Sequence, residues 1–282
     1  MRWLVIGSRG MLGQDLVDLL REHGHEAVGV DRDDVDITDP AATVDALAGV
    51  EVVVNCAAYT AVDAAETDEA TAFAVNAVGA ANVARAARRA GARLVHISTD
   101  YVFDGAATTP YAEDASLAPR SAYGRTKAAG EWAVRAECPD SMVVRTAFLY
   151  GARGPCFPRT IARVALERGG VDVVADQMGQ PTWTVDLAGL VLRLVAAGAP
   201  AGTYHGTSSG RTSWHGFARA VVAAAGLDPQ IVRPTTSEAF VRLAPRPAFS
   251  VLGHDTLRAA GIQPIGDWAQ RWDVAAAQVL GL

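Results

Sequence analysis

Three glycines near the start of the chain, at the spacing GxxGxxG, restrict the fold strongly: Gly7, Gly10 and Gly13. They follow residues 2–6, a short apolar run of β-favouring side chains, and precede residues 11–23, where leucines recur at helical spacing. A second apolar run covers residues 26–30. A strand, a glycine turn, a helix and a second strand within about 30 residues predict a βαβ unit with parallel strands.

Each glycine of this turn has a physical task if the turn binds phosphate. Gly7 permits the tight turn, Gly10 leaves room for a pyrophosphate beside the backbone, and Gly13 allows the helix to pack against the strand. The helix N-terminus then offers free N–H groups and a partial positive charge. Asp31 ends the second strand roughly 20 residues further on, where its carboxylate can bind an adenosine ribose. The combination predicts a dinucleotide site, whereas the glycines alone indicate only a tight turn.

The residues after the second strand give opposing indications about which dinucleotide is bound. The Asp31 carboxylate repels a 2′-phosphate and so favours NAD, whereas the neighbouring Arg32 guanidinium attracts that phosphate and favours NADP. We expect NADPH as the cofactor, with NADH also accepted.

The alternation of strands and helices continues through the first half of the chain. Apolar runs predict further strands at residues 50–54, 94–98 and 142–146. Helical periodicity predicts helices at residues 43–47, 66–89 and 121–136. Strands that are apolar throughout are typical of a parallel sheet buried on both faces. The sequence therefore predicts an α/β fold with a Rossmann-type doubly wound parallel sheet.

The character of the chain changes after residue 150, where prolines and glycines become more frequent. Helices are still expected at residues 186–196 and 214–225. A chain of 282 residues has room for one large domain or two modest ones. We expect residues 1–150 to form an NAD(P)-binding Rossmann domain and residues 151–282 a smaller, mainly substrate-binding α+β domain. Segments around residues 183–205 are expected to return to the sheet.

A YxxxK motif formed by Tyr123 and Lys127 begins the helix predicted at residues 121–136. Its i, i+4 spacing puts both side chains on one helix face, where the ammonium can stabilise a phenolate and lower the tyrosine pKa. Thr99 follows the strand at residues 94–98, at the sheet edge where parallel sheets bind ligands. Its hydroxyl can bind a substrate carbonyl that Tyr123 protonates. The alternative for the YxxxK pair is an ordinary exposed helix turn, and the alternative for Thr99 is a residue that merely ends the strand.

Composition excludes several other classes of protein. The chain has 25 Lys and Arg against 31 Asp and Glu, and this mild acidity argues against a nucleic-acid partner. Apolar runs are too short to predict a membrane span. The three cysteines are Cys56, Cys138 and Cys156, and they have no CxxC spacing. Because the histidines are not paired at helical spacing either, the sequence predicts neither disulfides nor a metal site. A reducing, cytoplasmic compartment is expected.

Several longer strings resemble those of the extended short-chain dehydrogenases/reductases, and more narrowly those of the dTDP-4-dehydrorhamnose reductase family. They are NCAAYTAVD at residues 55–63 followed by Glu66, STDYVF at 98–103, DQMGQPT at 176–182, TSWH at 212–215, and Arg246-Pro247. The resemblance runs nearly end to end. It implies an NAD(P)H-dependent reductase of the C4 ketone of a nucleotide-linked, dTDP-type 4-keto-6-deoxyhexose.

The resemblance also implies roles for individual residues. Tyr123 is the expected proton donor, and Lys127 is its partner and the anchor of the nicotinamide ribose. The remaining cofactor-binding residues implied are Gly7, Arg9, Gly10, Met11, Leu12, Gly13, Asp31, Arg32, Asp36, Ile37, Ala57, Ala58, Tyr59 and Thr60. The implied substrate-binding residues are Thr99, Asp100, Phe148 and Arg246, the last as a partner of the diphosphate.

The resemblance leaves some points open. Related rhamnose-pathway reductases carry a tryptophan where this chain has Phe148, which keeps an apolar wall but lacks the indole N–H. The sugar and the C4 configuration of the product are therefore undecided. Related 4,6-dehydratases place a second carboxylate after the Thr-Asp pair, where this chain has Tyr101. An epimerase and a regulatory subunit like that of methionine adenosyltransferase are further alternatives. The oligomeric state is also open, because the Ala-rich helices suit either a homodimer interface or core packing.

Overall fold

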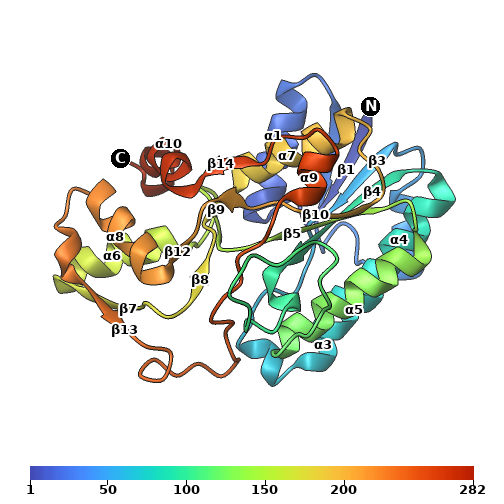
Figure 1. Cartoon of the computed structure of the whole chain (residues 1–282). Helices are drawn as coiled ribbons and strands as arrows, with labels where there is room; N and C mark the ends of the chain where they lie inside the picture. Colours follow the sequence, from blue (N-terminus) through green and yellow to red (C-terminus); the bar gives the residue numbers. More distant parts are fainter.

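Six parallel strands form the central sheet of the computed structural model, which describes residues 1–282 (Figure 1). Their order across the sheet is β10-β5-β4-β3-β1-β2. The strands are β1 (Arg2–Ile6), β2 (Glu26–Val30), β3 (Val52–Asn55), β4 (Arg93–Thr99), β5 (Met142–Thr146) and β10 (Gly202–His205). β1 and β3 pair in register from Trp3 opposite Val52 to Ile6 opposite Asn55, so the strands end at one edge. The α/β class and the Rossmann-type sheet predicted from the sequence are confirmed.

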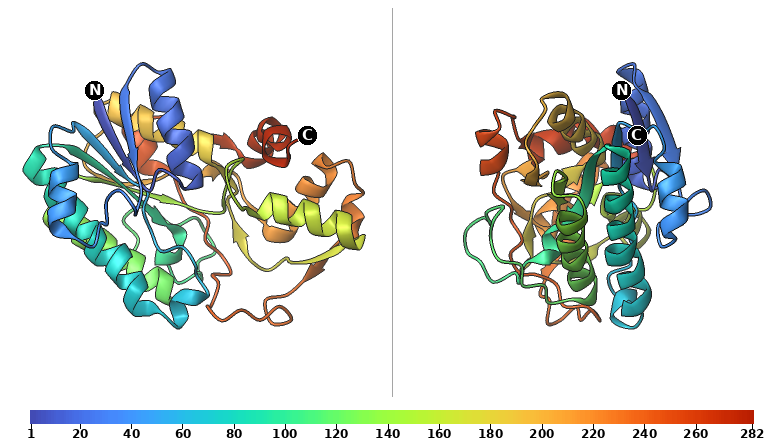
Figure 2. Two further views of the ribbon diagram at one scale, coloured as in Figure 1. Left: turned by 180° about the vertical axis from the view of Figure 1, so that it is seen from behind. Right: turned by 90° about the vertical axis from the view of Figure 1, so that its right-hand side faces the viewer.

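Helices cover both faces of the sheet, as the two further views show (Figure 2). α1 (Met11–Glu22) and α7 (Thr184–Ala196) pack together on one face. The other face is covered by α2 (Pro40–Ala46), α4 (Ala80–Ala90) and α5 (Ala122–Glu137). No helix of the chain combines the length and apolarity that a membrane crossing requires.

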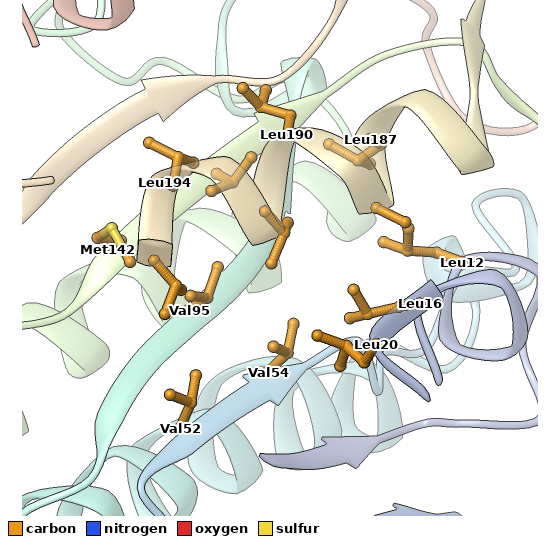
Figure 3. Close-up of a cluster of buried hydrophobic side chains, with 14 of the residues drawn as sticks. Leu12, Leu16, Leu20, Val52, Val54, Val95, Met142, Leu187, Leu190 and Leu194 are labelled. Atoms are coloured by element: carbon orange, nitrogen blue, oxygen red, sulfur yellow. The ribbon is translucent and has the colours of Figure 1, made fainter. Parts of the chain in front are cut away.

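Side-chain alternation along each strand divides the core between the two faces. Val52 and Val54 of β3 point into the cluster with the leucines of α1 and α7, whereas Val53 between them belongs to the opposite cluster (Figure 3). Successive residues of a strand face opposite sides of a sheet, and both sides are buried here. The continuous apolar runs seen in the sequence are explained by this arrangement.

The helix predicted over residues 66–89 is the main departure from the sequence-based elements. The chain forms a short 3₁₀ turn, η1 (Ala64–Glu66), then α3 (Glu69–Phe73), a π-helical turn η2 (Ala74–Gly79), and α4. Within η2, Asn76 turns its side chain to the backbone of Tyr59 instead of continuing a uniform helix. A widened turn that serves a tertiary contact cannot be read from apolar periodicity.

A smaller group of elements lies beside the sheet and has an apolar cluster of its own. It contains α6 (Phe157–Arg168), α8 (Trp214–Ala224), α10 (Trp268–Leu280) and the paired strands β7 (Val171–Val174) and β13 (Val232–Thr235), and is called the small lobe below. Its core includes the rings of Tyr150, Phe217 and Trp272. The chain visits the sheet layer between these elements, through α7 and β10, and again at α9 (Asp255–Ala259).

Two-stranded pairs connect the small lobe to the sheet layer. They are β6 (Leu149–Tyr150) with β9 (Thr182–Trp183), β8 (Met178–Gly179) with β12 (Thr212–Ser213), and β11 (Ser208–Ser209) with β14 (Ile265–Asp267). The helix predicted at residues 214–225 is observed as α8, and Ser213 caps it by accepting a hydrogen bond from the Gly216 N–H at 3.0 Å.

Candidate active site

The glycine turn lies between the ends of β1, β2 and β3. Gly7 has φ of +80°, and a Cβ there would lie 2.7 Å from the Ala57 nitrogen, so only glycine fits. Gly10 is the N-cap of α1 and provides no side-chain cap. The first N–H groups of α1 therefore lack helical partners and are available to an anion.

A cleft of about 760 Å³ runs along this edge of the sheet. Its lining contains many of the expected cofactor residues: Gly7, Gly10, Asp31, Arg32, Asp36, Ile37, Ala57, Ala58, Tyr59 and Thr60. Side chains from α3 and η2 close the opposite wall. The glycine backbone next to a carboxylate and a guanidinium suits a dinucleotide, because its pyrophosphate and its ribose need those groups.

The remaining residues expected around the cofactor lie next to this cleft rather than in its lining. Arg9 donates its backbone N–H to Asp31 at 2.9 Å, while its guanidinium is 2.6 Å from Asp33. Met11 packs against the small lobe, and Leu12 is buried in the sheet core. Gly13 packs against the glycine turn, where a Cβ would lie 2.3 Å from the Gly7 oxygen. Of these residues, Leu12 and Gly13 are fixed by packing, and the exposed Arg9 guanidinium pairs with Asp33.

The start of α5 is fixed by contacts from two other segments. Ser121 accepts a hydrogen bond from the Gly124 N–H at 3.1 Å, and Glu66 accepts one from the Ala122 N–H at 2.7 Å. A Cβ on Gly124 would lie 2.3 Å from the Tyr101 oxygen, so glycine lets α5 approach the end of β4. These contacts bring Tyr123, the second residue of α5, beside Thr99, the last residue of β4.

Tyr123 and Lys127 differ electrostatically from the sequence-based expectation. Burial raises the pKa of Tyr123 to about 12, and the hydrogen bonding of Thr99 offsets only part of that rise. The Lys127 ammonium donates to the Ile97 carbonyl at 2.7 Å, and burial lowers the pKa of Lys127 to about 8. In this arrangement the Tyr123 phenol lies beside the Thr99 hydroxyl, and the Lys127 ammonium is held at the β4 backbone.

Thr99 has its own proton engaged. Its hydroxyl donates to Asp100 at 3.0 Å and accepts from the Tyr101 N–H at 3.2 Å. Asp100 is 2% exposed, burial raises its pKa to about 6, and its second carboxylate oxygen has no hydrogen-bond partner. While Asp100 is ionised, Thr99 can accept from a phenol but can donate to a ligand only by leaving Asp100.

Phe148 is the one non-glycine residue with positive φ, at +45°. Its ring is stacked on the Trp214 indole, with centroids 3.6 Å apart and an interplanar angle of 11°, and it lies close to Gly179, where a Cβ would be 2.5 Å from the Phe148 Cε1 atom. A bulky residue in this backbone region is strained and marks functional sites more often than ordinary turns. Phe148, which follows β5, thus contacts the DQMGQPT string through Gly179 and the TSWH string through Trp214. The sequence did not predict that Trp214 stacks on Phe148.

Arg246 reaches the same region from the far part of the chain. Its guanidinium carbon lies 5.8 Å from the centre of the Tyr101 ring, whose centroid is 5.7 Å from that of Tyr123. One nitrogen pairs with Asp63 at 3.0 Å. Thr99, Asp100, Tyr123 and Arg246 therefore surround Tyr101, at the end of the sheet next to the cleft.

Two further groups were missed by sequence reasoning. Asn76 accepts from the Tyr59 N–H at 2.8 Å and donates to the Tyr59 carbonyl at 3.1 Å, which fixes one wall of the cleft. Glu131, one turn beyond Lys127, is fully buried and forms a paired contact with Arg145. Burial acts to raise the pKa of Glu131, but Arg145, Ser98 and Arg135 together outweigh it and hold that pKa below its usual value. For Asn76, the only signal in the sequence was a single asparagine within an apolar helical pattern.

Comparisons with known proteins agree along the whole chain. The family model described as RmlD substrate binding domain matches residues 1–280. A probable dTDP-4,6-dihydroxy-2-methyloxan-3-one 4-ketoreductase of Streptomyces antibioticus is 51% identical over 276 residues, which cover 95% of this chain and 92% of that protein. A dTDP-4-dehydrorhamnose reductase of Streptomyces griseus is 48% identical over 274 residues, which cover 95% of this chain and 90% of that protein. The crystal structure of such a reductase from Bacillus anthracis in complex with NADP superimposes with a TM-score of 0.93 at 35% identity, covering 97% and 98%.

Proposed function

The chain belongs to the dTDP-4-dehydrorhamnose reductase family, and on that premise we propose that it reduces the C4 ketone of a dTDP-linked 4-keto-6-deoxyhexose. The enzyme is an NADPH-dependent nucleotide-sugar 4-ketoreductase. The observation that carries this proposal is the pairing of Tyr123 with Thr99 at the end of β4, beside a dinucleotide cleft. When bound, NADPH supplies the hydride that the side chains cannot supply.

The residues of the chain then have the following proposed roles. The glycine turn and the N-terminus of α1 hold the pyrophosphate, and Asp31 and Arg32 face the adenosine ribose. Tyr123 donates its phenolic proton to the oxygen at C4 as the C–H bond forms. A phenol whose pKa is about 12 remains protonated at neutral pH, so it is available as an acid. Lys127 anchors the nicotinamide ribose, and Thr99 orients the Tyr123 phenol.

We propose that the small lobe and its connections select the substrate. The stacked rings of Phe148 and Trp214 provide an apolar wall, and Arg246 provides positive charge for the diphosphate. Asp100, with one unpaired carboxylate oxygen, is a candidate acceptor for a sugar hydroxyl. In this division residues 1–150 bind the cofactor and hold the acid, and residues 151–282 mainly bind the sugar nucleotide.

The function is tested by incubating the purified protein with a set of dTDP-4-keto-6-deoxyhexoses and either NADPH or NADH. We expect cofactor oxidation in step with formation of a C4 alcohol, whose configuration NMR of the product determines. Cofactor binding without turnover of any of these sugars would favour the regulatory-subunit alternative. A parallel incubation with a dTDP-hexose that still carries its C6 hydroxyl tests the dehydratase alternative. Loss of water without net cofactor oxidation would favour it, although Tyr101 occupies the position of its second carboxylate.

Two finer points complete the proposal. We propose a cytoplasmic location, since Cys56, Cys138 and Cys156 are all free thiols.

For self-association, the candidate surface is the one formed by α3, η2 and α5, where Phe73, Val78 and Trp132 are exposed. Light scattering of the purified protein at several concentrations tests for a dimer.

A further inference from the structure

Residues 236–250, called the strap below, run from β13 of the small lobe back to the sheet (Figure 1). Near its beginning, Ser237 donates its backbone N–H and its hydroxyl to Asp176 at 2.8 and 2.9 Å. Near its end, the Phe249 N–H donates to the Gly105 carbonyl at 3.1 Å. Both ends of the strap are therefore fixed by hydrogen bonds.

The middle of the strap is held by one carboxylate, that of Asp63. Its Oδ1 atom accepts from the Ala244 N–H at 3.2 Å and lies 3.0 Å from Nη2 of Arg246. Its Oδ2 atom lies 3.7 Å from Nη1 of Arg242. Asp63 ends the NCAAYTAVD string, whose earlier residues line the cofactor cleft, so this loop joins the cleft to the strap.

The Arg246 guanidinium is only partly satisfied by this contact. Its Nη1 atom is buried and has no hydrogen-bond partner, although its side chain is 17% exposed overall. A buried N–H group of a cation without an acceptor is costly and therefore calls for an explanation. The guanidinium lies over the Tyr101 ring, which in turn contacts the Tyr123 ring, so Arg246 belongs to the same region as the proposed acid.

We propose that Asp63 is a positioning residue for substrate binding: it holds one edge of the Arg246 guanidinium and leaves the other edge for the diphosphate of the nucleotide sugar. The planar guanidinium has separate donor edges, so a carboxylate and a phosphate can be bound together. Arg242 balances the charge of Asp63, which limits its repulsion of the phosphates. The inference rests on the proposed function for the identity of the ligand.

The test uses the full chain saturated with NADPH and measures the Kd of dTDP, an unreactive part of the substrate, by calorimetry. We expect Arg246→Ala to weaken dTDP binding about 30-fold and Asp63→Ala about tenfold, as expected for charge-assisted hydrogen bonds. The double variant Asp63→Ala/Arg246→Ala should equal Arg246→Ala, because Asp63 acts through that arginine. Independent, multiplied effects of the two substitutions, or no effect of Asp63→Ala, would overturn the proposal.

Matched variants separate positioning from general damage. Asp63→Asn keeps an acceptor oxygen, and dTDP affinity should stay within about threefold of the unmodified protein. Asp172→Asn removes an exposed pair with Arg233 at 2.7 Å, remote from Asp63, and should not change the dTDP Kd. The NADPH Kd and the melting temperature should be unchanged in all of these variants.

The outcome also separates this inference from the proposed function. If the unmodified protein turns over no dTDP-4-keto sugar but Asp63→Ala still weakens dTDP binding through Arg246, the function is wrong and the positioning role stands. If turnover occurs but Asp63→Ala leaves the dTDP Kd and the KM of the sugar nucleotide unchanged, the function stands and the positioning role is wrong. If the unmodified protein does not bind dTDP, the inference is overturned.

Discussion

At the scale of single residues, environment decides what each side chain of the YxxxK pair can do. The spacing of Tyr123 and Lys127 was visible in the sequence, but their electrostatics were not, because burial raises the tyrosine pKa and lowers the lysine pKa. Thr99 was expected as a donor to the substrate, and the structure shows its proton directed to Asp100. Residue type and spacing predicted the chemistry, whereas the direction of each hydrogen bond required the fold.

Arg32 provides a prediction about cofactor choice. It lines the cleft beside Asp31 and forms no ion pair in the structure. Arg32→Ala should therefore raise the Kd of NADPH about tenfold and leave that of NADH nearly unchanged, because only NADPH carries a 2′-phosphate. Fluorescence titration of both cofactors measures this ratio. Equal effects on the two cofactors would show that Arg32 does not meet the phosphate.

Asp100 provides a prediction about stability and pH. Its pKa is raised to about 6 by burial, so the folded protein holds this proton at pH values where the unfolded chain has lost it. Stability contributed by the protonated group is present below about pH 4 and is lost as the pH rises through 6. Asp100→Asn, which cannot ionise, should therefore gain melting temperature relative to the unmodified protein as the pH rises from 4.5 to 7.5. A constant difference across that range would contradict the shifted pKa.

At the scale of elements, the strands and most helices follow from local pattern, and the π-helical turn η2 does not. β1, β2 and β5 have the predicted bounds, because apolar runs between polar turns leave little choice. In the π turn, Asn76 hydrogen-bonds the backbone of Tyr59, a tertiary contact that apolar periodicity does not indicate. The close approach of α5, where a Cβ on Gly130 would lie 2.1 Å from the Asn76 oxygen, is likewise set by tertiary packing.

Asn76 tests this view of η2. Asn76→Ala removes two hydrogen bonds to the part-buried backbone of Tyr59 and a buried one to Thr126, which should lower the free energy of unfolding by about 2–4 kcal/mol. It should also raise the NADPH Kd, because Tyr59 lines the cleft. Thr207→Val, a buried polar substitution outside the cleft, should lower stability without changing the NADPH Kd. Denaturant unfolding and fluorescence titration distinguish the two, and an unchanged NADPH Kd in Asn76→Ala would count against this role.

At the scale of the whole molecule, cofactor and substrate functions share one continuous structure. Although the sequence changes character near residue 150, the edge strand β10 and the covering helix α7 come later in the chain. Leu187, Leu190 and Leu194 of α7 complete the core beneath α1 (Figure 3). Segments around residues 183–205 were expected to return to the sheet, and α7 and β10 are the elements of that range that cover it or extend it.

A truncation follows from this topology. A fragment of residues 1–150 lacks α7 and β10, so one face of its sheet would expose the apolar cluster that includes Val52, Val54 and Val95. We expect the fragment to aggregate or to give a poorly dispersed amide spectrum, and to bind no NADPH. A well-dispersed NMR spectrum with NADPH binding would instead show that the first 150 residues fold independently.

The central claim is that Tyr123 protonates the C4 oxygen of a dTDP-linked 4-keto sugar during reduction by NADPH. Its most direct test is single-turnover reduction by the Tyr123→Phe variant, followed by NADPH absorbance, with NADPH and dTDP affinities measured on the same preparation. The account predicts unchanged affinities and a rate about 10²–10⁴-fold lower than that of the unmodified protein, as removal of a general acid typically gives. A variant that retains near-normal turnover would contradict it.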